Sequence, residues 1–205
     1  QSYWDARYMK NMEKLSKPLY KMKEERNIYV PMRDGTKLCL DIFRPDAPGK
    51  FPALLSVSGY NKDHQSLHLA TKMPPQDFRS ILFDHSIEAG SIDFFVKRGY
   101  AQVIPDIRGV GKSEGEFYGT HCKEEQEDSY DIIEWMAQQP WCDGNVGMMG
   151  YSAYSGAQFY TAVENPPHLK AIYLSGFAPD SYRGPSYTGG VLCLFPGRIE
   201  KTCGT

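Results

Sequence analysis

The sequence predicts an α/β protein in which a mostly parallel β-sheet carries helices on both faces. Residues 51–57 and 100–105 are almost continuously apolar, which is typical of central strands buried on both sides. Residues 92–97 and 123–139 show the apolar period of helices. Strands that alternate with helices in this way favour a parallel sheet, and 205 residues suffice for one domain with a sizeable core.

The first 26 residues show the period of an amphipathic helix. Lysines fill its polar faces, and Pro18 interrupts it. A basic amphipathic helix can lie on a membrane, but packing against the chain's own domain is the favoured interpretation. We therefore expect a helical segment over residues 1–26 and the domain proper over 27–205. The apolar stripe, at steps of three and four, consists of Trp4, Tyr8, Met12, Leu15, Leu19 and Met22.

Less regular segments surround these elements. Residues 27–32 and 36–44 predict a β-hairpin around the turn at 33–35. Residues 64–88 have little periodicity and are expected to form a long surface loop, a feature that is uncommon unless it is functional. A last strand is expected over residues 169–174, and the Gly- and Pro-rich remainder shows no confident element.

The stretch from Val146 to Gly156 has the pattern of a buried strand that turns sharply into a helix. The apolar run ends at Gly150, and Ser152 follows at the apex. A nucleophile elbow has this arrangement, because the tight turn exposes the serine hydroxyl beside a helix N-terminus, where negative charge is favoured. The usual pattern is Gly-x-Ser-x-Gly, and Tyr154 replaces its second glycine. Since surface serines in Gly-rich turns are common, the flanking strand and helix carry this prediction.

Polar side chains follow several of the predicted strands. Catalytic groups of parallel α/β sheets lie at the carboxyl ends of the strands. Tyr60, Asp106 and Ser152 each come after a predicted strand, so we expect them on one rim of the sheet.

Residues 106–113 resemble part of a phosphate-binding loop through the run Gly-Val-Gly-Lys-Ser. The Walker pattern needs a glycine five positions before Gly111, where Asp106 stands instead. Residues 114–119 are also rich in turn formers, whereas the motif requires a helix. The sequence therefore predicts no nucleotide site.

Composition and charge exclude several classes of function. A net charge of -2 indicates no nucleic-acid partner, and no apolar stretch approaches a membrane span. The five cysteines are scattered and form no Cys-x-x-Cys pair, which predicts neither a metal site nor a disulfide framework. We expect no cofactor. No secretory signal is visible, which favours the cytoplasm, although a signal already removed would leave secretion open.

Short motifs spread over residues 27–190 form a recognisable set. They are Val30-Pro-Met-Arg-Asp-Gly-Thr-Lys-Leu38, Asp41-Ile-Phe-Arg-Pro45, Gly59-Tyr-Asn-Lys-Asp63, Arg98-Gly-Tyr-Ala101, Asp106-Ile-Arg-Gly109, Ser113-Glu-Gly115, Gln139-Pro-Trp141, Asp143-Gly-Asn-Val-Gly147 and Pro167-His-Leu-Lys-Ala171. The combination resembles the X-Pro dipeptidyl-peptidase and cocaine-esterase-like hydrolases, and it is specific even where single motifs are weak.

This resemblance implies an α/β-hydrolase fold and acyl transfer by a serine nucleophile, carried onto Ser152. It also implies an oxyanion hole made by a tyrosine hydroxyl, carried onto Tyr60, and by the backbone N–H after the serine, here that of Ala153. Family members often have tyrosine at the latter position, but a backbone donor survives the change. The expected partner is a small ester, amide or peptide substrate, and the dipeptidase, esterase and acylase activities of the family all stay open.

The end of the chain departs from the family pattern. A hydrolase triad runs serine, acid, histidine in chain order, whereas His168 is the only histidine after Ser152 and precedes the acidic candidate Asp180. In the family, the acid and the base follow a helical cap beyond this length. We therefore expect the amino-terminal part of a catalytic domain, truncated after the strand that follows the nucleophile helix. Such a truncation predicts an open sheet edge and homo-oligomeric association. The rival interpretation is a non-catalytic hydrolase-like binding protein or an inactive fragment.

Overall fold

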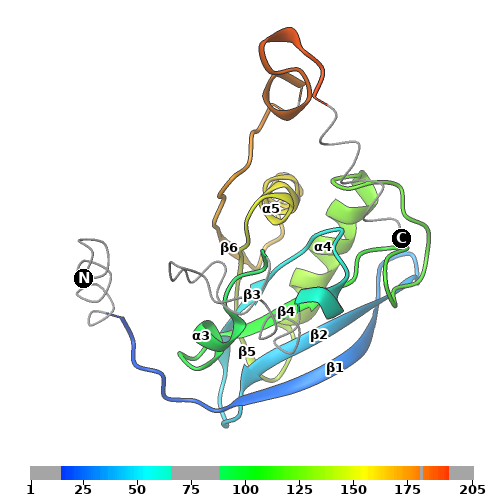
Figure 1. The fold of residues 1–205 in the computed structure, drawn as a ribbon. Helices are drawn as coiled ribbons and strands as arrows, with labels where there is room; N and C mark the ends of the chain where they lie inside the picture. Colours follow the sequence, from blue (N-terminus) through cyan, green and yellow to red (C-terminus); the bar gives the residue numbers. More distant parts are fainter. Residues whose placement is uncertain (1–14, 66–87, 181, 194–205) are drawn as a thin grey trace, which may run out of the picture.

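A six-stranded sheet organises the computed structural model, which describes residues 15–65, 88–180 and 182–193 (Figure 1). The strand order is β1-β2-β4-β3-β5-β6. Strands β1, β2 and β4 pair antiparallel, and β4, β3, β5 and β6 pair parallel, which confirms the mostly parallel sheet. The bounds are β1 Met22–Pro31, β2 Lys37–Pro45, β3 Phe51–Leu55, β4 Ala101–Pro105, β5 Cys142–Met148 and β6 Leu169–Ile172.

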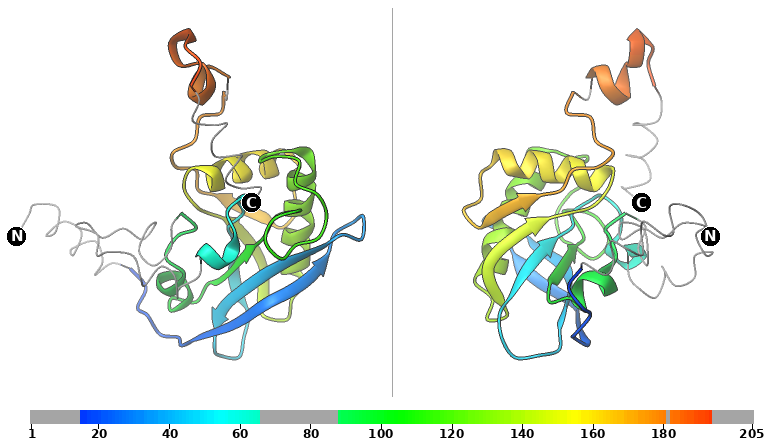
Figure 2. Two further views of the ribbon diagram at one scale, coloured as in Figure 1. Left: turned by 45° about the vertical axis from the view of Figure 1, so that its right-hand side comes forward. Right: turned by 90° about the vertical axis from the view of Figure 1, so that its left-hand side faces the viewer.

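Helices cover both faces of this sheet, as predicted (Figure 2). Adjacent residues of β2 point to opposite faces: Ile42 joins the cluster that contains Ile132 of α4, and Phe43 joins the cluster that contains Ile92 of α3. Among the described residues, no helix is both long enough and apolar enough to cross a bilayer. The helices are α3 Ile92–Val96, α4 Lys123–Ala137 and α5 Ala153–Val163, with short turns η1 Lys62–Gln65, η2 Tyr182–Ser186 and η3 Thr188–Gly190.

The helix expected over residues 1–26 is wrong for the part that the structure describes. Residues 15–21 have no regular secondary structure, and β1 begins at Met22, which pairs with Pro45. The Leu19 N–H donates to the Lys97 carbonyl at 2.8 Å. Tertiary pairing therefore overrides the helical period, and β1 runs through the expected boundary after residue 26. Residues 1–14 lie outside the described residues.

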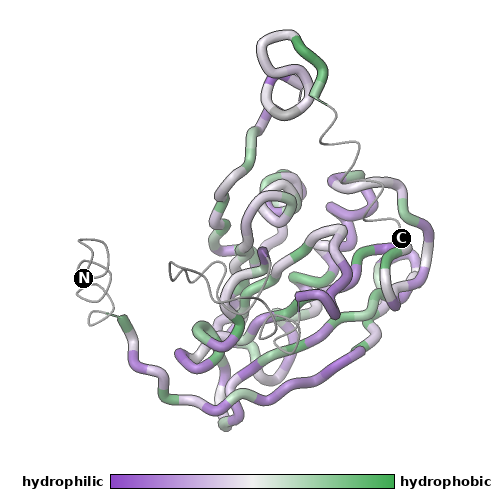
Figure 3. The backbone as a smooth tube through the Cα atoms, viewed as in Figure 1, coloured by the Kyte–Doolittle hydropathy of each residue, from purple (hydrophilic) through white to green (hydrophobic). Residues whose placement is uncertain are grey.

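The core lies along the central strands, where hydrophobic residues gather in Figure 3. Leu55 of β3, Val103 of β4 and Val146 of β5 have no exposed surface. Full burial of such a side chain typically contributes about 1.5–3 kcal/mol, so these strands stabilise the frame that carries the site. The continuous apolar runs marked them correctly in the sequence.

The sequence predicted no regular secondary structure for two segments, residues 64–88 and the Gly- and Pro-rich end of the chain. Most of the expected loop over residues 64–88 lies outside the described residues, and its first two residues belong to η1. After Ser175 the chain leaves the sheet, and the segment that carries η2 and η3 stands apart from it (Figures 1 and 2).

Strand β6 is the last strand of the sheet within the described residues, and it is poorly covered. Its burial falls from half-buried Leu169 to exposed residues, and Tyr173 just beyond it is 53% exposed. An open parallel edge can accept another strand. Association of the chain with itself stays a prediction.

Candidate active site

Ser152 occupies a strained position between a strand and a helix. Strand β5 ends at Met148 and α5 begins at Ala153, so Ser152 directly precedes the helix. Its backbone has φ 59° and ψ -116°, a conformation that residues with side chains rarely adopt. The Ser152 N–H donates to the Ser175 carbonyl at 2.9 Å, which ties the turn to the segment after β6. The predicted strand–turn–helix is therefore present, with the serine at its apex.

The turn depends on a close approach at Gly150. This residue has φ 135°, and a Cβ added there would lie 2.4 Å from the Cβ of Tyr154. The Gly150 carbonyl accepts the hydroxyl of Ser155 at 2.9 Å. The first glycine of the Gly-x-Ser pattern is therefore required by both backbone conformation and space.

The second glycine of the usual pattern has a substitute two residues further along α5. Tyr154 is buried with the hydrophobic cluster on the α3 side of the sheet, so a large side chain fits at that position. The close contact instead falls at Gly156, where an added Cβ would lie 2.3 Å from Nε2 of His121. The helix is therefore approached closely by an imidazole.

The Ala153 N–H points out of the N-terminus of α5. The Ser152 carbonyl accepts the N–H groups of Ser155 at 2.9 Å and Gly156 at 3.2 Å, so it points along the helix. In a trans peptide unit the following N–H points the opposite way, and a first-turn N–H has no partner within its own helix. The Ala153 N–H is thus a fixed donor beside the serine.

Tyr60 lies beside the same elbow. It follows β3, which is the parallel neighbour of β5, and its ring centroid is 6.3 Å from that of Tyr154 in the first turn of α5. Its N–H donates to the hydroxyl of Ser58 at 3.2 Å. The structure therefore brings the segments of Tyr60 and Ser152 to one end of the sheet.

Asp106 lies at the same end of the sheet, where its carboxylate accepts hydrogen bonds from backbone N–H groups. One of its carboxylate oxygens accepts the Lys62 N–H at 2.7 Å, and the other accepts the Lys112 N–H at 3.0 Å. A Cβ on Gly111 would lie 2.3 Å from this carboxylate. The Gly-Val-Gly-Lys-Ser loop therefore wraps around an internal carboxylate, which explains its likeness to a phosphate loop. Burial raises the pKa of Asp106.

Lys62 is an anchor that the motif Gly-Tyr-Asn-Lys-Asp did not reveal. Its side chain has no exposed surface, and Nζ lies 2.8 Å from the Asp63 carboxylate and 3.2 Å from that of Asp41 in β2. Burial by itself would lower the pKa of Lys62. The two carboxylates have the larger combined effect, so the pKa of Lys62 lies above its ordinary value. This ion pair fastens the loop after Tyr60 to the sheet.

Two histidines of the described chain make side-chain contacts with groups other than Ser152. Nδ1 of His168 lies 2.7 Å from Glu134, and His168 directly precedes β6, at the amino end of that strand. Nε2 of His121 lies 3.1 Å from the Ala153 carbonyl, which only accepts, so this nitrogen carries a proton. His85, like residues 66–87 as a whole, lies outside the described residues.

Glu88 is a carboxylate beside the elbow that sequence reasoning missed. Its carbonyl accepts the Tyr151 N–H at 3.0 Å, one residue before the serine. Its buried Oε2 has no hydrogen-bond partner among the described residues, and burial raises the pKa of Glu88 to about 7. No local pattern marked it, because it closes the aperiodic segment that ends at residue 88.

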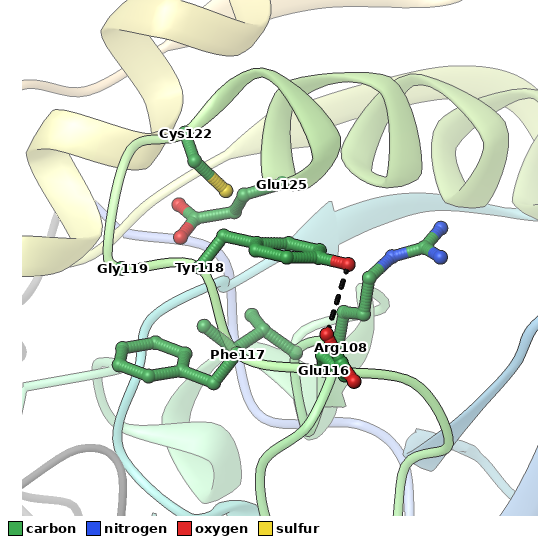
Figure 4. Close-up of a pocket in the computed structure, with 8 residues that line it drawn as sticks. Arg108, Glu116, Phe117, Tyr118, Gly119, Cys122 and Glu125 are labelled. Atoms are coloured by element: carbon green, nitrogen blue, oxygen red, sulfur yellow. Dashed lines mark hydrogen bonds between the residues drawn. The ribbon is translucent and has the colours of Figure 1, made fainter.

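A small cleft beside α4 is separate from these groups (Figure 4). Its volume is about 10 Å³, enough for roughly one water molecule, so it cannot hold a substrate. Burial raises the pKa of Cys122, which keeps this thiol protonated and unreactive. In the described segments, no cluster of His, Cys, Asp and Glu could hold a metal ion. The lining residues are Ile107, Arg108, Glu116, Phe117, Tyr118, Gly119, Cys122 and Glu125.

Comparison with known proteins reveals relatives over most of the chain. The sequence model of the X-Pro dipeptidyl-peptidase (S15 family) matches residues 34–199. Cocaine esterase from Rhodococcus sp. (strain MB1 Bresler) is 41% identical over 169 residues, which cover 82% of this chain and 26% of that enzyme.

Solved structures agree with this relationship. A CocE/NonD family hydrolase from Staphylococcus aureus is 36% identical with a TM-score of 0.64, over 79% of this chain and 29% of that protein. An α/β hydrolase from Penicillium sp. sh18 shares the fold at 16% identity and a TM-score of 0.53, over 75% of this chain and 45% of that one. The α/β-hydrolase fold implied by the motifs is confirmed. The chain spans less than a third of the length of cocaine esterase and of the Staphylococcus hydrolase.

Proposed function

The chain belongs to the X-Pro dipeptidyl-peptidase (S15) family, and we propose that it carries the nucleophile and oxyanion hole of a serine hydrolase acting on ester or amide bonds. The observation that supports this proposal most directly is the conformation of Ser152, φ 59° and ψ -116° at a strand-to-helix apex. Strain of this kind persists where the surrounding structure imposes it, and it is concentrated at functional sites.

The chemistry assigns one role to each residue. The Ser152 hydroxyl loses its proton to a base as its oxygen attacks the substrate carbonyl carbon, and the carbonyl oxygen becomes an oxyanion. The Ala153 N–H and the Tyr60 hydroxyl donate to that oxyanion. Collapse of the intermediate breaks the bond to the leaving alcohol or amine, which takes up the proton. Water then hydrolyses the acyl-serine and restores the hydroxyl.

The base and its acid partner are proposed to come from outside the described residues. Of the three described histidines, His121 and His168 are engaged by the Ala153 carbonyl and by Glu134, and His64 is exposed on η1. The proposed substrates are small esters, amides or peptides. One relative is named cocaine esterase, and the family is that of the X-Pro dipeptidyl-peptidases, which supports this proposal. The chemistry needs no cofactor.

The test uses the full-length natural protein and two substitutions. Ser152→Ala should abolish hydrolysis of p-nitrophenyl acetate and labelling by a fluorophosphonate probe. Tyr60→Phe should lower kcat by about 100- to 1000-fold, the usual cost of one oxyanion donor, with little change in stability. Ser129→Ala is a matched control, because the buried Ser129 hydroxyl has no hydrogen-bond partner in the part of the chain that the structure describes. Labelling that survives Ser152→Ala would contradict the nucleophile assignment.

The second candidate is a hydrolase-like protein that binds a ligand or partner without catalysis. The engagement of His121 and His168 favours it, because a serine without a base is a poor nucleophile. The same experiment decides between them. A full-length protein that folds, binds small esters and never reacts with the fluorophosphonate would support the binding function.

A further inference from the structure

We propose that His121 is a positioning residue that holds Ala153, and with it the oxyanion donor, through a hydrogen bond from its imidazole. This inference rests on the proposed function, because it concerns the N–H assigned to the oxyanion. The two residues are 32 positions apart in the sequence, and their contact joins the N-terminal ends of α4 and α5.

The hydrogen bond fixes the state of the imidazole. Nε2 of His121 lies 3.1 Å from the carbonyl oxygen of Ala153. A carbonyl oxygen has no proton to give, so Nε2 must be the donor. The carbonyl and the N–H of Ala153 flank one Cα atom, and therefore the imidazole restrains the residue whose N–H faces the substrate side.

The other side of the same Cα is also restrained. The peptide unit that contains the Ala153 N–H has its carbonyl on Ser152, and this carbonyl accepts the N–H groups of Ser155 and Gly156. The Ser152 N–H is bonded in turn to Ser175. His121 thus restrains this turn from the α4 side.

His121 is itself held in an uncommon backbone conformation. Its φ is 62°, in the left-handed region that histidine tolerates better than most residues. Its N–H donates to the buried carboxylate of Glu125 at 3.0 Å, and its carbonyl accepts Nε2 of Gln126 at 3.0 Å. The first turn of α4 therefore holds both ends of the residue, and burial raises the pKa of Glu125.

The helix makes room for the ring at Gly156. A Cβ added there would lie 2.3 Å from Nε2 and 2.4 Å from Cε1 of His121, closer than real atoms approach. Gly156 does not have a positive φ, so it is required for space and not for backbone conformation. The rings of Tyr160 at 5.4 Å and Phe177 at 6.5 Å bound the imidazole on further sides. A socket of this kind leaves the ring little freedom.

Two substitutions at one position separate the hydrogen bond from the packing. In the full-length protein, His121→Phe keeps a ring in the socket and removes the donor, whereas His121→Gln removes the ring and keeps an N–H donor. We expect kcat for p-nitrophenyl acetate to fall about 10- to 100-fold in His121→Phe with KM nearly unchanged, because an oxyanion donor acts in the transition state. His121→Gln should retain more of kcat. Rates are divided by the sites that a fluorophosphonate titrates, so that misfolded protein does not count.

A third substitution approaches the same contact from the helix. Gly156→Ala should displace the imidazole and lower kcat to about the level of His121→Phe. His121→Gly leaves space for the new methyl group, so the double variant with Gly156→Ala should be no slower than the slower single variant. Such non-additivity is expected when two changes break one interaction. Losses that multiply in the double variant would overturn the proposal.

The outcomes distinguish this inference from the function on which it rests. Activity that survives Ser152→Ala overturns the proposed function and this inference with it. Activity that requires Ser152, combined with an unchanged kcat in His121→Phe, overturns the positioning role alone. An equal loss in His121→Phe and His121→Gln would also contradict it, because the donor would then not be what matters.

Discussion

The carboxylate of Asp106 accepts the backbone N–H of Lys62 at 2.7 Å, so the end of β4 holds the loop that follows Tyr60. The second oxygen of Asp106 holds the Lys112 N–H at 3.0 Å. One buried side chain therefore joins two loops across the rim of the sheet. A carboxylate suits this position because both of its oxygens accept.

Asp106→Asn should destabilise the protein although it preserves the shape of the side chain. The amide offers one acceptor where two are needed, and its NH2 group faces a backbone N–H. We expect the free energy of unfolding in urea to fall by about 1–3 kcal/mol, the usual cost of an unpaired buried polar group. Asp46→Asn, at an exposed aspartate, is the matched control. Equal stabilities of the two variants would count against this role for Asp106.

Gly111→Ala should lower the stability of the protein because the added methyl group clashes with a neighbour, and not only because the backbone has a positive φ. Gly111 has φ 57°, and its added Cβ would lie 2.3 Å from the Asp106 carboxylate. Gly189 has a similar φ of 63° with nothing within 4 Å, so Gly189→Ala measures the conformational cost alone, about 1–2 kcal/mol. We expect Gly111→Ala to lose about 1–3 kcal/mol more, as overpacking does. Thermal melting of both variants tests this, and equal losses would contradict the steric explanation.

The architecture was predictable from the sequence because the central strands are buried on both faces. Burial of this kind leaves continuous apolar runs, and the runs at 51–57 and 100–105 became β3 and β4. Residues 27–31 of β1 were predicted as the first strand of the hairpin, but residues 22–26 were missed, because β1 pairs on one side only and these residues are exposed or half-buried. Its first residue, Met22, fits a helical period with Leu19, and only pairing with β2 decides between the two structures.

In the candidate site, too, the sequence predicted the residues marked by a local pattern and missed those whose partners are distant in the sequence. Ser152 and Tyr60 follow strands, so their shared end of the sheet followed from topology. His121 and Glu88 carried no such signal, because their partners, Ala153 and Tyr151, are distant in the sequence and meet them only in the folded chain. The need for glycine at Gly156 likewise appears only once the imidazole is in place.

Glu88 should make the stability of the protein depend on pH. Its pKa is about 7 in the folded chain against an ordinary 4.5, and burial is the cause. Below pH 4.5 both states hold the proton and no cost arises. As the pH rises from 4.5 through 7, the unfolded state loses its proton more readily, so stability falls by at most about 3 kcal/mol and then levels off.

Glu88→Gln removes this titration and should therefore raise the free energy of unfolding at pH 8 but not at pH 4.5. Glu164→Gln, at the end of α5, is the control and should show the same difference from the parent at both pH values. Urea unfolding of all three proteins across this range measures the effect. A stability gain in Glu88→Gln that is the same at pH 4.5 and pH 8 would show that the carboxylate does not titrate as expected.

The last prediction is that the 205-residue chain by itself does not turn over substrate. His121 is occupied by the Ala153 carbonyl, and His168 lies at the amino end of β6, whereas Ser152 follows the carboxyl end of the parallel strand β5. Without a base, the serine hydroxyl keeps its proton at neutral pH, and the oxyanion donors have no developing charge to stabilise. A triad enzyme that lacks its base can retain about 10³–10⁴-fold over water, but only where the substrate is still held. Neither Ser152 nor Tyr60 lines the cleft of about 10 Å³ beside α4 or the larger cleft of about 290 Å³ between α5 and β6, so neither of these two clefts holds a substrate at the serine. Hydrolysis of p-nitrophenyl acetate by the chain should therefore equal that by its Ser152→Ala variant. A Ser152-dependent turnover would contradict this prediction and make His121, freed from Ala153, or His85 the first candidates for the base.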